Sequence, residues 1–324
     1  MSTGKSPSSA QRARRNSWRG LIIAGAAGIA LVPLTIWVLP YAVLASDLAR
    51  GIPSKCDPAS TLKYRQSMDL MATEISESMA HARLVDRDPT FDIVKIQTAG
   101  RAFWIPRKGS DQQGLTSVAN LQAEHRWMEK ANPDLQVTPG ETVLDCGAHV
   151  GVFTDTALRR GAATVVAFEI DPDNLECLRR NFAPEIAQKR VILVSKGVWS
   201  SETSMDFTIS RQDSAMNSLV LSVAGAKTIK VPLTRIDTEL KELGISKVDF
   251  IKMDIEGAER EALAGAAGTL RQYKPILALD AYHRLDDREV LPKVILAANS
   301  GYVQTCGPCE RYWDSYKPHV FYFH

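Results

Sequence analysis

The sequence has almost no net charge and few cysteines. Its 39 basic and 37 acidic side chains give a formal charge of +2, so the overall balance does not indicate a nucleic-acid partner. The 5 cysteines are odd in number and scattered, and they imply no disulfide framework. Internal repeats and low-complexity segments are also missing. The 45 % hydrophobic content is instead typical of a chain with a sizeable globular core.

Two of the cysteines form the segment Cys306-Gly-Pro-Cys309, which has the spelling of a thioredoxin-like redox motif. Such a motif should follow a strand and open a helix early in a βαβ unit. Here it lies near the C-terminus, between Tyr302-Val303 and the apolar run 320–323. We therefore predict a turn between two strands.

Acidic residues are missing from the first 19 positions, which hold five basic ones. The following 25 residues, 21–45, carry no charge, and a helix needs about 20 such residues to cross a bilayer. We predict a basic tail over 1–20 and a single transmembrane helix over 21–45, which would place the protein at a membrane. A cleaved signal peptide is the alternative, since Val43-Leu44-Ala45 is a passable cleavage site.

Residues 46–115 combine a linker with two structured segments. Ser46–Pro58 has the composition of a linker, and Thr61–Val85 places apolar side chains at near-helical spacing. Two β-rich runs in Phe91–Pro106 surround Ala99-Gly100 and predict a hairpin. We expect these segments to form an extension in front of the main domain.

Short apolar runs alternate with helical patterns through the main domain, residues 116–324. Its first helix is predicted over Ser117–Lys130 and ends at Asn132-Pro133. Nearly apolar strands separated by helices indicate an α/β, Rossmann-like, doubly wound fold, with a mostly parallel sheet covered by helices on both faces. The predicted strands are Thr142–Asp145, Thr164–Glu169, Arg190–Val194, Val248–Asp254 and Pro275–Asp280, and the helices include Asn174–Phe182 and Gly257–Leu270.

A glycine-containing loop ends the first of these strands and opens a helix. Its Gly147-x-x-x-Gly151 spacing fits neither the dinucleotide fingerprint G-x-G-x-x-G nor a phosphate loop that ends in Gly-Lys-Ser/Thr. Asp145 would repel a pyrophosphate but would attract a sulfonium ligand that carries an ammonium group. The loop therefore favours a cationic ligand.

A second acid, Glu169, ends the next strand, 24 residues after Asp145. A carboxylate at this position can accept hydrogen bonds from both hydroxyls of a ribose. Taken singly, each glycine is explained as a helix cap, and Glu169 is explained as a solvated surface acid. Together, on consecutive strand ends, these residues favour a nucleoside site.

These residues resemble those of FkbM-type methyltransferases, a branch of the class I enzymes that use S-adenosylmethionine. The resemblance runs from about Glu141 to Asp280 and rests on "VLDCGAHVG", "AFEIDPDNLECLRRN", "VPLTRIDTEL" and "VDFIKMDIEGAEREALAGA". It implies S-adenosylmethionine as cofactor and O-methylation of a hydroxyl on a small-molecule, glycan or lipid-linked acceptor. His149 departs from the family pattern, which usually has Asn. The cofactor-binding residues that the resemblance implies are Asp145, Gly147, Ala148, His149, Gly151, Glu169 and Ile170.

Candidate catalytic residues follow the later strands, where ligands of open α/β sheets bind. Methyl transfer requires removal of the acceptor proton, and His283 is the predicted base because its ordinary pKa lies near neutrality. Asp254 would position the acceptor or a water, and Glu256 would cap or line the site. A surface-loop histidine is the alternative reading of His283. Asp254 and Asp280 also offer oxygen ligands for a divalent ion, but two are few for Mg²⁺, and we assign no metal site.

The sequence leaves the side of the membrane open. The positive-inside rule keeps the basic flank in the cytosol and places the main domain outside, where S-adenosylmethionine is usually scarce. A different function is a membrane-tethered, non-catalytic nucleoside-binding or interaction module. Asp145, Glu169 and Asp254, at three strand ends, argue against that module. A nucleic-acid substrate is not expected, because the domain lacks a basic, aromatic stripe.

Overall fold

The structure is a computed structural model that describes residues 45–46, 49–51, 56, 58–108, 110–209, 219–220, 227–311 and 315–324. The expected transmembrane helix, 21–45, lies outside the described residues except for Ala45. Within the described ranges, no helix combines the length and the apolar character needed to cross a membrane. The chain divides into Met1–Ser54 and Lys55–His324, and the second unit is described here.

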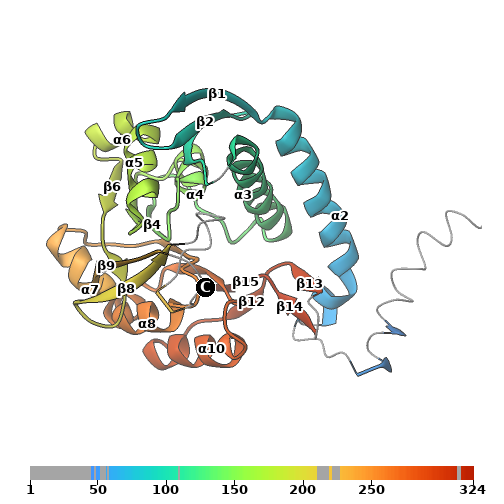
Figure 1. The fold of residues 1–324 in the computed structure, drawn as a ribbon. Coiled ribbons are helices and arrows are strands. Elements are labelled where there is room, and N and C mark those ends of the chain that lie inside the picture. The colour runs from blue at the N-terminus through green and yellow to red at the C-terminus, as the bar shows by residue number, and fades with distance from the viewer. Residues whose placement is uncertain are drawn as a thin grey trace, which may run out of the picture. The chain divides into compact units, whose positions relative to one another are not determined.

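A seven-stranded sheet lies at the centre of this unit, in the order β12-β15-β11-β10-β4-β5-β6 (Figure 1). The five strands from β11 to β6 are parallel, whereas β15 is antiparallel to β11 and β12. This arrangement confirms the predicted Rossmann-like α/β fold with a mostly parallel sheet. The strands are β4 (Thr142–Cys146), β5 (Thr164–Phe168), β6 (Val191–Val194), β10 (Phe250–Met253), β11 (Ile276–Asp280), β12 (Gln304–Cys306) and β15 (Val320–Phe323).

Helices cover both faces of the sheet because successive side chains of each strand point to opposite faces. Val143 and Val165 belong to a buried cluster with side chains of α3, α4 and α5, whereas Leu144 and Val166 pack with α7 to α10 (Figure 1). The predicted helix Gly257–Leu270 is interrupted at Ala266. The helices are α3 (Asp111–Ala131), α4 (Val152–Arg159), α5 (Pro172–Asn181), α6 (Ala183–Ala187), α7 (Ile236–Glu242), α8 (Glu259–Gly265), α9 (Ala267–Tyr273) and α10 (Asp287–Ala298).

The segments before the main domain form α2 (Pro58–His81) and a three-stranded antiparallel sheet of β1 (Arg83–Asp88), β2 (Ile93–Gln97) and β3 (Ala102–Pro106). The β2–β3 pair confirms the predicted hairpin. The predicted helix was too long at its C-terminal end, because Arg83 and Leu84 pair with β2 instead. The sheet shares a buried cluster with the main domain, which includes Phe103.

Two smaller sheets complete the unit: β7 (Gly197–Val198), β8 (Thr203–Ile209) and β9 (Lys227–Thr234), and the pair β13 (Cys309–Arg311) and β14 (Tyr316–Pro318). Gly307-Pro308 connects β12 to β13, which confirms the predicted turn. Cys309 forms a disulfide with Cys56, 253 residues earlier, and Cys306 is not disulfide-bonded. The spacing of the cysteines does not predict this disulfide, because Cys56 and Cys309 are far apart in the sequence and approach only in the folded chain.

Candidate active site

The site lies where the chain reverses its course through the sheet. β4 is the first strand of the large sheet in sequence order and lies between β5 and β10. Ligands of such sheets bind at the carboxyl ends of the strands beside this reversal. An open pocket is found there, lined by residues that follow β4, β5 and β10.

The loop after β4 and the loop after β10 touch through their backbones. Gly147 has a φ of +80°, and a Cβ at this residue would lie 2.0 Å from the carbonyl oxygen of Asp254. Only glycine therefore fits here. The N–H groups of Gly147 and Ala148 donate to the Phe168 carbonyl at 3.1 and 3.0 Å, which ties the same loop to the end of β5.

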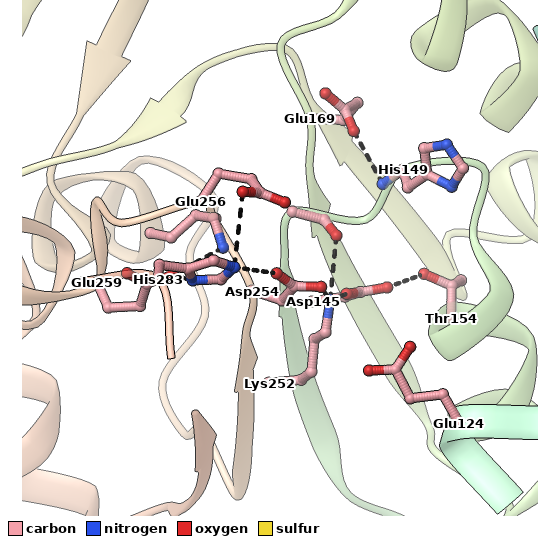
Figure 2. Close-up of polar contacts among 12 residues, drawn as sticks. Glu124, Asp145, His149, Thr154, Glu169, Lys252, Asp254, Glu256, Glu259 and His283 are labelled. Carbon is pink, nitrogen blue, oxygen red and sulfur yellow. Dashed lines mark hydrogen bonds and ion pairs between the residues drawn. The ribbon is translucent and has the colours of Figure 1, made fainter. Parts of the chain in front are cut away.

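Glu169 joins the loops after β4 and β5. Its Oε2 accepts from the His149 N–H at 2.8 Å (Figure 2). Its Oε1 accepts from the N–H groups of Ile170 at 2.6 Å and Asp171 at 2.8 Å. Burial, together with the nearby Asp171 carboxylate, raises the pKa of Glu169 to about 7. A carboxylate on the pocket wall at this strand end is suited to bind a ribose diol.

The structure separates the residues expected to bind the cofactor into two groups. Asp145 is fully buried and accepts a hydrogen bond from Thr154 Oγ1 at 2.6 Å, so it holds α4 to the end of β4. Burial raises the pKa of Asp145. Gly151, with a φ of +91°, opens α4. Neither residue lines the pocket, whereas the others do: Gly147, Ala148, His149, Glu169 and Ile170.

Lys252 lines the pocket, although the sequence pattern did not lead us to predict it as a site residue. Its Nζ donates to the Gly147 carbonyl at 3.2 Å and lies 3.6 Å from Asp254 Oδ2. Burial disfavours its charged form, but the carboxylates of Asp254 and Asp145 outweigh burial and raise the pKa of Lys252 above its usual value. The available signal was a lysine in an otherwise apolar strand, "DFIKMD". The pocket also has an apolar wall formed by Val198, Phe207 and Leu219.

The predicted catalytic residues come together beside this pocket. Nε2 of His283 lies 3.5 Å from Asp254 Oδ1 and 3.7 Å from Glu256 Oε2 (Figure 2). Its Nδ1 forms a 3.0 Å hydrogen bond with Oε1 of Glu259. The histidine side chain is only 3 % exposed, which contradicts its alternative reading as a surface-loop residue.

The charges around His283 change its acid–base properties. Burial disfavours the imidazolium, but the hydrogen bond to Glu259 and the carboxylates of Asp254 and Glu256 raise the pKa of His283 to about 10. The expectation of a near-neutral pKa is therefore wrong in this environment. Burial opposes the charge of Asp254, yet Lys252 and His283 lower its pKa, so Asp254 is ionised at neutral pH.

Asp280 is a second acidic neighbour of Asp254. Burial and the Asp254 carboxylate raise the pKa of Asp280 well above its usual value, and its carboxyl group hydrogen bonds to Asp254. Both residues line a smaller second cavity, together with Glu124. Asp280 is thus a proton donor to Asp254 rather than a second free carboxylate.

Known proteins resemble the main domain. Residues 145–303 match the family model described as "Methyltransferase FkbM domain". The methyltransferase sdnD of Sordaria araneosa is 27 % identical over 153 residues, which cover 38 % of this chain and 59 % of that protein. The hexuronic acid methyltransferase AglP of Haloferax volcanii is 29 % identical over 151 residues, which cover 46 % of this chain and 59 % of that protein.

The chain therefore spans 59 % of the length of both relatives. A solved structure of a methyltransferase FkbM from Methylobacillus flagellatus KT matches 67 % of this chain and 56 % of its own, at 21 % identity and a TM-score of 0.44.

Proposed function

Because the chain carries an FkbM-type methyltransferase domain, we propose that it transfers a methyl group from S-adenosylmethionine to a hydroxyl oxygen. One observation carries this proposal. Glu169, the Gly147 loop and the carboxylates of Asp254 and Glu256 face one pocket at the carboxyl ends of three neighbouring strands. A cofactor bound at the first two would have the last two beside its reactive end.

The residues present fit this cofactor. When bound, S-adenosylmethionine supplies an electrophilic methyl group on a positively charged sulfur. Glu169 would accept hydrogen bonds from the ribose, and the apolar wall that contains Phe207 would exclude water from the adenine. Asp254 and Glu256 provide negative charge that favours a sulfonium, and the close approach at Gly147 keeps the two loops in register.

Asp254 and His283 are the residues that we propose to act on the acceptor. The ionised Asp254 carboxylate accepts a hydrogen bond from the acceptor hydroxyl and so orients its oxygen toward the methyl group. The proton of that hydroxyl passes to His283 Nε2, which requires the neutral form of the ring. Three surrounding carboxylates oppose that form, so this role requires a basic medium.

The relative AglP supports a sugar acid as the acceptor, because it is named a hexuronic acid methyltransferase. The uncharged run 21–45 and its basic flank support a single-pass membrane location, which would bring the domain close to lipid-linked glycans. We therefore propose a hydroxyl of a uronic-acid-containing glycan as the substrate.

The test is incubation of the full chain with methyl-labelled S-adenosylmethionine and two matched oligosaccharides, one containing a uronic acid and one containing the neutral sugar. We expect label in the first. Glu169→Ala should weaken cofactor binding by about 1–3 kcal/mol, measured by calorimetry, because charge-assisted hydrogen bonds are lost. Glu77→Ala, on an exposed face of α2, is the control with unchanged binding.

Each result separates a different alternative. Label in the neutral sugar alone would replace the proposed acceptor but keep methyl transfer. Cofactor binding without label in any acceptor, including lipid-linked glycans, would support the non-catalytic module. A parent chain that does not bind S-adenosylmethionine would overturn the proposed function.

A further inference from the structure

We propose that Asp254, Glu256 and His283 bind a first-row divalent metal ion at the edge of the cofactor pocket. Within the part of the chain that the structure describes, one group of at least three potential ligands has all its ligand atoms within 4.8 Å of one another, and it consists of these residues. Figure 2 shows the imidazole directed between the two carboxylates.

The distances within the group are those of ligands around one ion. His283 Nε2 lies 3.5 Å from Asp254 Oδ1 and 3.7 Å from Glu256 Oε2, which is too long for good hydrogen bonds. Metal–ligand bonds of about 2.1 Å place adjacent ligand atoms roughly 3.0–3.5 Å apart. The ligand oxygens of Asp254 and Glu256 lie within 4.8 Å of each other, so the two carboxylates would draw together around an ion.

The buried histidine is an independent sign of a missing ligand. Its side chain is 3 % exposed, and Nε2 is buried without a hydrogen-bond partner. Burying such an atom costs free energy unless something binds it. Nε2 points toward the carboxylates of Asp254 and Glu256, where an ion would give it a partner.

Glu259 sets the orientation and the tautomer of this ring. Its Oε1 already accepts from the N–H groups of Ile255 at 3.0 Å and Gly257 at 3.3 Å, so it accepts from Nδ1 of His283 as well. Nδ1 is then the donor, and Nε2 can present its lone pair. A carboxylate behind a histidine in this way is the usual outer-shell arrangement of metal ligands.

The same carboxylate fixes the loop that supplies the other two ligands. Glu259 is fully buried, and its hydrogen bonds hold the backbone between Asp254 and α8. Glu256 within this loop has a φ of +54°, which is unfavourable for a glutamate and directs its side chain toward His283. Glu259 is therefore a positioning residue for all three ligands.

The donor set selects the kind of ion. Carboxylates suit Mg²⁺, Ca²⁺ and Mn²⁺, whereas imidazole suits first-row transition ions, so Mn²⁺ and Zn²⁺ satisfy both donors. Three protein ligands leave coordination positions for water or an acceptor oxygen. Asp254 and Glu256 line the pocket, so these positions would open toward the substrate. A bound ion would occupy the Nε2 lone pair, so catalytic use of the ion would replace the role of His283 as base. That use rests on the proposed function, but the binding of the ion does not.

The sequence offered Asp254 and Asp280 as a pair of metal ligands, and the structure changes this pair. Asp280 is not a member of the group, and its carboxyl group hydrogen bonds to Asp254 from the side of the second cavity. The two oxygens of Asp254 have separate neighbours, since Oδ2 faces Lys252 and Oδ1 faces His283. Oδ1 is therefore the ligand atom.

The experiment is titration of the chelator-treated full chain with Mn²⁺ alone, with free Mn²⁺ measured by electron paramagnetic resonance. We expect saturable binding of one ion per chain. Glu256→Gln and His283→Gln should each weaken it by more than about tenfold, and Glu259→Gln by about 10–100-fold. Glu289→Gln, which removes an exposed acid on α10, should leave the affinity unchanged. Displacement of Mn²⁺ by Zn²⁺ at the same stoichiometry would support the mixed donor set.

Calorimetry with S-adenosylmethionine on the same samples separates this proposal from the proposed function. Parent chain that binds S-adenosylmethionine but not Mn²⁺ would overturn the metal site and leave methyl transfer intact. Mn²⁺ binding without cofactor binding would do the reverse. Circular dichroism identifies any variant that has not folded, and equal Mn²⁺ affinity in the parent and a folded Glu256→Gln or His283→Gln variant would also overturn the site.

Discussion

Glu169 has two roles in the cofactor site. It accepts three backbone N–H groups within its own loop and the loop after β4, and it also lines the pocket. Burial nevertheless raises its pKa to about 7, since those hydrogen bonds do not fully replace water. The free site thus holds this carboxyl group near its titration point at physiological pH.

This pKa predicts a pH-dependent cofactor affinity. The ionised carboxylate is the form that accepts the ribose hydroxyls, so binding should strengthen as the pH rises through about 7 and weaken about tenfold per unit well below it. Calorimetry between about pH 5.5 and 8.5 measures the effect, with Glu169→Gln as the variant that should bind weakly and lack this dependence. Parallel curves for parent and Glu169→Gln would show that another group is responsible.

The stability of the fold should depend on pH in the opposite direction to the cofactor affinity. The folded pKa of about 7 exceeds the ordinary value of 4.5, so the folded chain binds the proton more tightly than the unfolded chain. Stability from this group is therefore largest below pH 4.5 and falls as the pH rises through about 7.

Residues at strand ends were the ones that sequence analysis identified best. Gly147 and Glu169 follow short apolar runs, so their place at the edge of the sheet follows from the alternation of strands and helices. Lys252 and the role of Glu259 were missed for a physical reason. Their importance depends on contacts with Gly147 and His283, which lie far away in the sequence and approach only in the folded sheet.

At the scale of elements, Asn181 connects the N-terminal sheet to the cofactor domain. This residue ends α5, and its amide group bridges two other segments. Its Oδ1 accepts from the Trp104 N–H at 2.7 Å, and its Nδ2 donates to the carbonyls of Trp104 at 3.0 Å and Val150 at 2.9 Å. One side chain thereby fixes β3 next to the loop that opens α4.

Replacement of this amide should destabilise the protein. Asn181→Leu leaves one N–H and two carbonyl groups without their partner, and each unsatisfied buried group costs about 1–3 kcal/mol. We expect the free energy of unfolding to fall by about 3 kcal/mol or more, measured by urea denaturation. Asn181→Asp retains the acceptor but loses both donated bonds, so its effect tests which bonds matter. Gln112→Ala, on an exposed part of α3, should be neutral, and a similarly neutral Asn181→Leu would contradict this account.

The elements themselves were predictable to different degrees. Parallel strands such as β4 and β10 are buried on both faces, so they stand out as apolar runs. β1 carries "RLVDRD" and is mostly exposed, so its sequence lacks that signal and its pairing with β2 decides its structure. The start of α3 had a signal that was overlooked. Ser110 Oγ accepts from the Gln113 N–H at 3.2 Å and caps the helix seven residues before its predicted start at Ser117.

At the scale of the whole molecule, the unit Lys55–His324 has the features of a self-sufficient domain. It contains buried clusters on both faces of the large sheet and a disulfide between Cys56 and Cys309. Among the residues that the structure describes, the members of both clusters follow position 81. Folding of the unit should therefore not depend on the residues proposed to lie in the membrane.

Deletion of residues 1–45 tests the membrane segment. A spanning helix packs against lipid rather than against the domain core, so residues 46–324 should remain folded and soluble without detergent, whereas the full chain should sediment with membranes. Deletion of residues 1–20 alone is the matched control. It removes the basic tail but keeps the uncharged run 21–45, and its product should still sediment with membranes. Circular dichroism and ultracentrifugation distinguish the possibilities. A full chain that is soluble without detergent, combined with a shortened chain that precipitates, would mean that residues 21–45 pack into the domain, because loss of a core helix exposes the apolar surface that it had covered.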